Sequence, residues 1–133
     1  MSRVAQYIVI DDPNFGVGGG GSASGGSSPS PGLWTEFDFQ VPSNCYLNHP
    51  SVLTWMLDFK MNDNDSFLEV LINGISVYSA TYVNNRYQPV QEVINPNILL
   101  WGKNMITFRC NSTASAAFTP IISDVVLWIE VSV

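Results

Sequence analysis

Charged side chains are scarce in this chain of 133 residues, and positive ones are the scarcest. Lysine and arginine together number 5 against 11 aspartates and glutamates, which gives a net charge of −6. A nucleic-acid-binding surface needs a basic patch to displace counterions, and so few scattered cations cannot form one. The same scarcity argues against docking on an anionic membrane surface. Nucleic acid is therefore not an expected partner.

Long apolar runs and cysteines are also few. No run approaches the roughly 18–20 residues that span a bilayer, so no membrane span is expected. The segment Met1–Tyr7 lacks the apolar core of a secretory signal, which leaves the compartment open, with an extracellular surface or a virion among the alternatives. The cysteines Cys45 and Cys110 are too few for a disulfide framework or a structural zinc site. Two buried thiols are the favoured interpretation, and one bridge is the alternative.

Residues suited to catalysis are few as well. The single histidine, His49, lies in a loop-like sequence beside Pro50, where a solvated side chain is expected more often than a general base. The acidic pair Glu36 and Asp38 falls on one face of an expected strand, which is typical of a solvated face and not of opposed glycosidase carboxylates. The sequence therefore predicts a protein that is not an enzyme, with a glycosidase as a distant alternative.

The composition that is present fits one packed domain over residues 1–133. Apolar residues make up 46%, enough for a core, whereas charged residues make up 12%, about half of the roughly 25% usual in soluble domains. Surface that lacks charge is either rich in small polar residues or covered by other subunits. A homo-oligomer is accordingly expected.

Strand patterns recur at short spacing, and no segment has a helical period. Asn73-Gly74 is the strongest local signal, because this pair accepts the two positive φ angles of a type I′ hairpin turn. Gly16–Gly32 is rich in Gly, Ser and Pro and is expected to be a loop or arm within the domain. The pattern predicts an all-β fold, an antiparallel β-sandwich of the jelly-roll type. The eight expected strands are Val4–Ile10, Leu33–Val41, Val52–Lys60, Ser66–Ile72, Ile75–Ser79, Val90–Asn95, Met105–Asn111 and Ile121–Val133.

Two motifs in residues 66–131 resemble those of galactose-binding-like jelly rolls, including the sugar-binding domains of β-galactosidases. One is Leu68–Gly74 (LEVLING), which resembles their "VNG" hairpin. The other is Val93–Arg109 (VINPNILLWGKNMITFR), where a turn with Pro and two Leu precedes Gly-x-Asn and a strand that ends in Phe-Arg. The resemblance implies the fold. It implies sugar recognition less strongly, because many such domains only support a neighbouring catalytic domain.

The turn in the second motif also has a physical logic of its own. Asn95 can cap it, and Pro96 suits a first helical position because it has no donor to leave unpaired. Leu99 and Leu100 are expected to close the end of the sandwich, and Gly102 supplies the left-handed residue that stops the turn. Trp34 and Trp101 lie near strand ends and are assigned to packing.

The segment Thr81–Gln88 is the expected ligand-binding loop. Sugar recognition uses an aromatic ring against the C–H face of the sugar, with amide or guanidinium groups for its hydroxyls. The alternative is a long hairpin connection whose aromatics fold onto the sandwich. The candidate binding residues are Tyr82, Asn84, Asn85, Arg86, Tyr87 and Gln88.

Asp63 and Asp65 lie in the Asx-rich segment 62–65 and are the candidate metal ligands. Calcium favours such oxygen donors, and the family resemblance also implies a structural calcium. Asx-rich turns are common without a metal, because these side chains bond their own backbone. No other cofactor is expected.

Two functions follow from these observations. The first is a non-catalytic, lectin-like carbohydrate-recognition module, an oligomer whose partner is a glycan. The alternative is a structural assembly protein whose partners are other subunits, such as a virion decoration, fibre or cell-surface subunit. The low charge and the Gly-rich segment favour the second, and the aromatic and amide cluster favours the first.

Overall fold

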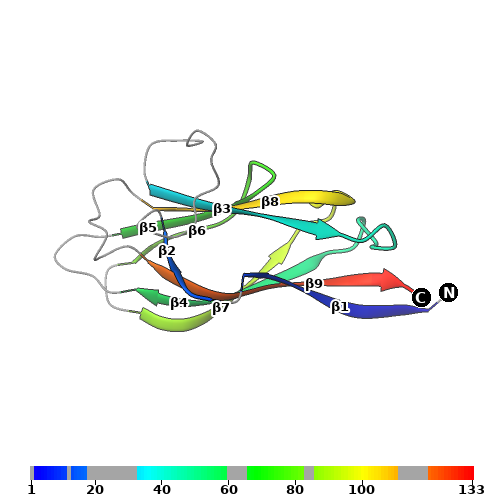
Figure 1. The fold of residues 1–133 in the computed structure, drawn as a ribbon, viewed down its shortest axis with the longest axis horizontal. Coiled ribbons are helices and arrows are strands. Elements are labelled where there is room, and N and C mark those ends of the chain that lie inside the picture. Colours follow the sequence, from blue (N-terminus) through cyan, green and yellow to red (C-terminus); the bar gives the residue numbers. More distant parts are fainter. Residues whose placement is uncertain (1, 12, 18–32, 60–65, 83–85, 111–119) are drawn as a thin grey trace.

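The computed structural model describes residues 2–11, 13–17, 33–59, 66–82, 86–110 and 120–133 as an all-β sandwich (Figure 1). No helix in these ranges is long and apolar enough to cross a membrane. The strands are β1 (Arg3–Asp11), β2 (Phe15–Gly16), β3 (Leu33–Val41), β4 (Ser51–Phe59), β5 (Ser66–Ile72), β6 (Ile75–Tyr82), β7 (Arg86–Ile94), β8 (Gly102–Cys110) and β9 (Ile121–Ser132).

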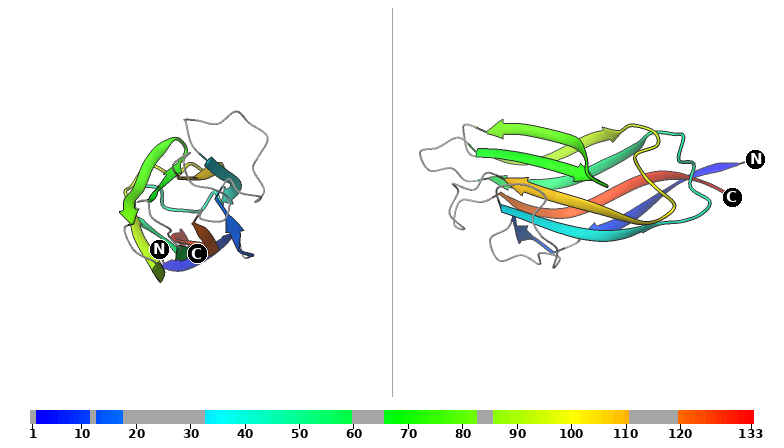
Figure 2. Two further views of the ribbon diagram at one scale, coloured as in Figure 1. Left: turned by 90° about the vertical axis from the view of Figure 1, so that its left-hand side faces the viewer. Right: turned by 90° about the horizontal axis from the view of Figure 1, so that it is seen from above.

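Two antiparallel sheets form the layers of the sandwich (Figure 2). The first sheet has the order β1-β9-β4-β7, with the short β2 paired to β9, and the second has the order β3-β8-β5-β6. Both ends of the chain lie at one end of the sandwich, beside the β3–β4 and β7–β8 connections (Figure 1). The predicted jelly-roll sandwich is thus confirmed, with β2 added to the eight expected strands.

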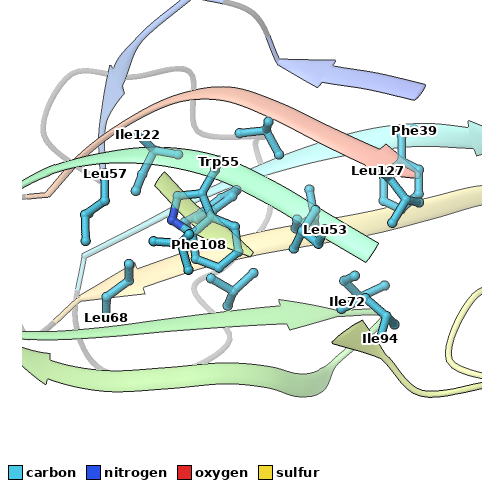
Figure 3. Packing of buried hydrophobic residues seen from close by; sticks show 14 of the residues in the cluster. Phe39, Leu53, Trp55, Leu57, Leu68, Ile72, Ile94, Phe108, Ile122 and Leu127 are labelled. Carbon is cyan, nitrogen blue, oxygen red and sulfur yellow. The ribbon is translucent and has the colours of Figure 1, made fainter. Parts of the chain in front are cut away.

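The core lies between the sheets because apolar side chains alternate along their strands. Leu53, Trp55 and Leu57 of β4 are at most 1% exposed, and Trp55 lies against Phe108 of β8 (Figure 3). The Trp55 and Phe108 ring centroids are 6.1 Å apart at 80°, an edge-to-face arrangement. The expected inner face of β4 is confirmed for these three residues.

The two cysteines are free and buried. Burial raises the pKa of Cys45, and it raises the pKa of Cys110 to about 11. A thiol reacts as its thiolate, so both groups are held in the unreactive form.

We expect neither cysteine to react with a thiol reagent at pH 8 in the folded protein. Two equivalents should react after unfolding in urea, which a colorimetric thiol assay measures; rapid labelling of the native chain would contradict this burial.

Two asparagines join the hairpin and the turn that carry the family resemblance. At Asn73 and Gly74, φ is 52° and 81°, as the type I′ turn requires. Asn73 Nδ2 donates to Asn104 Oδ1 (2.8 Å), and Met105 N donates to Asn73 Oδ1 (3.0 Å). Asn104 Oδ1 also accepts from Leu100 N, and its Nδ2 donates to Leu100 O (2.8 Å). The β5–β6 hairpin therefore holds the β7–β8 turn in place.

Candidate functional site

The expected ligand-binding loop is shorter than the sequence predicted. Thr81 and Tyr82 end β6, and Arg86–Gln88 begin β7, so the connection between these strands is confined to residues 83–85. The prediction that this strand begins at Val90 was wrong, because β7 begins at Arg86 and includes Pro89. Proline is tolerated in an edge strand, where its missing donor breaks no ladder, and β7 is the edge of its sheet.

The described candidate residues of this segment separate into buried and exposed side chains. Tyr82 is 7% exposed, and its hydroxyl bonds the hydroxyl of Tyr78. Tyr87 is 77% exposed, and Gln88 beside it is half-buried. Asn84, Asn85, the side chain of Arg86, and the candidate metal ligands Asp63 and Asp65 lie outside the described residues. Their ligand roles stay predictions.

Tyr87 borders a hollow on the outer side of the first sheet, here called the Tyr87 hollow. Its volume is about 100 Å³. Tyr87 lies directly across from Asp58 of β4, and Asp58 in turn lies across from Ile121 of β9. The exposed ring thus stands beside carboxylate, amide and hydroxyl side chains. The residues that line the hollow and matter here are Asn14, Met56, Asp58, Tyr87, Ile121 and Ser123.

A second hollow, the Trp101 hollow, lies at the opposite end of the sandwich. It has a volume of about 370 Å³ and is lined by Cys45, Tyr46, Leu47, Asn48, Asn97 and Trp101. Trp101 is 59% exposed, so its assignment to packing was wrong. Leu99 closes the end of the sandwich at 6% exposed, whereas Leu100 is 54% exposed. The turn after Pro96 has room for one buried leucine, and the following side chains point outward.

Asp38 and His49, two of the candidate catalytic groups, are held by contacts with neighbouring surface side chains. Asp38 Oδ2 lies 3.4 Å from the Nζ of Lys103, which is on the neighbouring strand β8. His49 Nδ1 lies 3.6 Å from Glu130 Oε2, and its ring stacks on Tyr46 with centroids 5.0 Å apart. Within the described ranges, no three His, Cys, Asp or Glu side chains gather as a metal site.

No protein-family model matches the sequence, and no curated protein matches it. Solved structures do share its fold. The chain superposes on dimeric latent PorU from Porphyromonas gingivalis with a TM-score of 0.66 over 99% of its length, at 9% identity. It superposes on BuGH86 in complex with neoagarooctaose with a TM-score of 0.58 over 97%, at 13% identity. The jelly-roll fold is confirmed.

A third structure is comparable in size to this chain. It is a family 35 carbohydrate binding module from an environmental isolate, with a TM-score of 0.50 and 15% identity over 95% of this chain and 90% of that one. By contrast, the chain spans 13% of the length of PorU and 19% of the length of BuGH86. The fold expected from the resemblance to galactose-binding-like jelly rolls is therefore observed both within larger chains and as a separate module.

Proposed function

We propose that this chain is a non-catalytic, lectin-like carbohydrate-binding module that holds a glycan in the Tyr87 hollow. The observation that carries the proposal is the Tyr87 ring, which is 77% exposed and lines a hollow. A tyrosine this exposed contributes little to the core, and its open face suits the C–H surface of a sugar ring. The likeness to a family 35 carbohydrate binding module supports the same function.

The walls of the Tyr87 hollow supply groups that pair with sugar hydroxyls. The Asp58 carboxylate accepts hydrogen bonds, the Asn14 amide donates and accepts them, and Ser123 adds a hydroxyl. Asn84, Asn85 and Arg86 precede Tyr87 in the chain and are proposed as further partners. Gln88 is paired with the buried Leu57 and therefore faces the opposite side of β7 from Tyr87, so its proposed contribution is to position the strand. Tyr82 is buried, and its proposed contribution is to position the neighbouring segment.

Replacing Tyr87 by alanine is the direct test. Isothermal titration with neutral oligosaccharides (neoagarooctaose, xylohexaose and cellohexaose) should detect binding to the native chain. Tyr87→Ala should weaken it at this site by roughly fivefold or more, since stacking contacts of this kind are each worth about 1 kcal/mol. Tyr87→Phe keeps the ring and should bind almost normally. Equal affinities for the native chain, Tyr87→Ala and Tyr87→Phe would contradict the proposed site.

A second candidate function, structural assembly, is supported by the edge strand β1. Edge strands are commonly protected by charge or proline against pairing with another chain. Pro89 lies in the edge strand β7, and Glu36 and Asp38 lie in the edge strand β3. By contrast, the edge strand β6 and the part of β1 between Arg3 and Asp11 carry neither a charge nor a proline. Within the described residues, β1 pairs with β9 alone.

The outer face of the first sheet continues this apolar surface. Tyr7, Trp128, Val52 and Val93 are paired in that order across all four long strands. Tyr7 and Trp128 are 60% and 44% exposed, with ring centroids 5.4 Å apart. A row of this kind suits contact with other subunits, so assembly through β1 is the proposed route to the oligomer.

Lysine substitutions on the two edge strands test assembly. Val4 and Val93 are 46% and 57% exposed, so lysine at either position leaves the core intact. If β1 pairs between copies, Val4→Lys should give a monomer by light scattering, and Val93→Lys should keep the native mass. Dissociation by Val93→Lys alone would place the contact on the sheet face. A native protein that is monomeric at 100 μM (about the upper range of such measurements) would exclude assembly through β1.

A further inference from the structure

We propose that the Trp101 hollow is a second binding site, for a neutral sugar unit, at the end of the sandwich opposite the Tyr87 hollow. The two hollows share no residue. They lie at the two ends of the nine-residue strand β7, because Tyr87 is near its start and Trp101 follows its end. A strand of nine residues is about 30 Å long, so one small ligand cannot occupy both.

The Trp101 ring is exposed yet held in place. Its Nε1 donates to the Cys45 carbonyl oxygen at 2.9 Å, and Cys45 is buried at 5% exposed. The single polar atom of the indole is thus satisfied, and what remains exposed is the apolar ring. An aromatic ring fixed in this way loses little conformational freedom when a ligand stacks on it. Exposed surface of this kind suits the C–H face of a sugar.

The loops that carry the ring are tied to each other and to the core. Asn97 N donates to the Leu47 carbonyl oxygen at 3.0 Å, which joins the β7–β8 turn to the β3–β4 connection. Asn97 holds this position with φ at 70°, in the left-handed region. Asn104 bonds both Leu100 N and Leu100 O from beneath. The walls of the hollow are therefore set before any ligand arrives.

The chemistry of the lining selects a neutral ligand. Asn48 and Asn97 offer exposed amides. None of the residues lining this hollow carries a charge, unlike the Tyr87 hollow with its Asp58. A ring face with flanking amides and no charge fits the hydroxyls and C–H face of an uncharged sugar. The volume of about 370 Å³ falls within the range of roughly 300–1,000 Å³ common for small-ligand sites.

Two sugar sites at opposite ends would let one chain bridge two glycan strands, or two parts of one strand. Linked sites raise the overall avidity of a protein without any new contact. This consequence depends on the proposed function of the Tyr87 hollow. Binding of a sugar in the Trp101 hollow does not depend on that function, because the walls of the Trp101 hollow come from other loops.

Matched substitutions in the β7–β8 turn test the second site. Trp101→Ala removes the stacking ring, and Leu100→Ala removes the neighbouring side chain, which is 54% exposed and does not line the hollow, as the control. In titrations with neoagarooctaose, xylohexaose and cellohexaose, the native chain and Leu100→Ala should show two sites. Trp101→Ala and Tyr87→Ala should each show one, and the double variant none. Thermal unfolding of each variant verifies that it is folded.

The outcomes separate the two sites. If Trp101→Ala binds every sugar as the native chain does, the second site is refuted while the Tyr87 proposal stands. If Trp101→Ala abolishes all binding and Tyr87→Ala changes nothing, the second site stands and the first falls. If none of the three neutral sugars binds the native chain, both are overturned. Tighter binding of a charged galacturonate oligomer than of the neutral sugars, lost in Trp101→Ala, would refute the neutral class.

Discussion

Asn104→Ala should lower the free energy of unfolding by about 2–4 kcal/mol, because several part-buried polar groups lose their partners at once. Asn104 is 2% exposed. Its amide oxygen accepts from Asn73 Nδ2 and Leu100 N, and its amide nitrogen donates to the carbonyl oxygens of Leu100 and Gly102. Each group left unsatisfied costs roughly 1–3 kcal/mol. Water entering the space left by the amide would recover part of this cost.

The measurement is urea unfolding followed by circular dichroism, with Asn48→Ala as the matched control. Asn48 is also an asparagine of this end of the sandwich, but it is exposed, so its removal should change stability by less than about 0.5 kcal/mol. Because Asn104 fixes the turn before Trp101, the variant should also bind sugar less well at the Trp101 hollow. Equal stability of the two variants would contradict the structural role of Asn104.

The fold could be predicted because its signals are local. The Asn73-Gly74 pair accepts the positive φ angles that a two-residue hairpin needs, and Gly102 adopts φ at 83° where the turn stops. The alternation of Leu53 and Trp55 identified the inner face of β4 in the same way. That Asn73 and Asn104 contact each other could not be predicted, since 31 residues separate them and no local preference reports such a pairing.

The site was predicted less well, because exposure depends on which elements cover a residue. Tyr82 and Tyr87 look alike in sequence, yet one is 7% exposed and the other 77%. They end and begin strands of different sheets, so only their packing distinguishes them. The exposure of Trp101 was missed for the same reason. The sequence did contain a signal for this exposure, because Leu99, Leu100 and Trp101 are three large residues in a turn that can bury only one large side chain.

Arg109 and Glu69 form the most buried ion pair among the described residues, with side chains 21% and 15% exposed. Arg109 Nη2 donates to Glu69 Oε1, and its guanidinium lies 5.8 Å from the centroid of the Phe67 ring. Burial raises the pKa of Glu69, but hydrogen bonds from Arg109 and Ser76 and the charge of Arg109 lower it more, and the net pKa is lowered. Ionised Glu69 therefore stabilises the fold above its unfolded pKa of about 4.3, and this stability is lost as the pH falls through the lower folded pKa.

Arg109→Met should reverse that dependence and cost about 1–3 kcal/mol at pH 7, since it leaves Glu69 as a partly buried carboxylate without its charged partner. Burial then dominates the pKa of Glu69 and raises it, so protonation relieves the penalty. The stability gap between the variant and the native chain should narrow between pH 7 and pH 4, as urea unfolding at both values would measure. The double variant Glu69→Met/Arg109→Met should recover most of the loss. A double variant as unstable as Arg109→Met would show that Arg109 acts through packing on Phe67 and not through its charge.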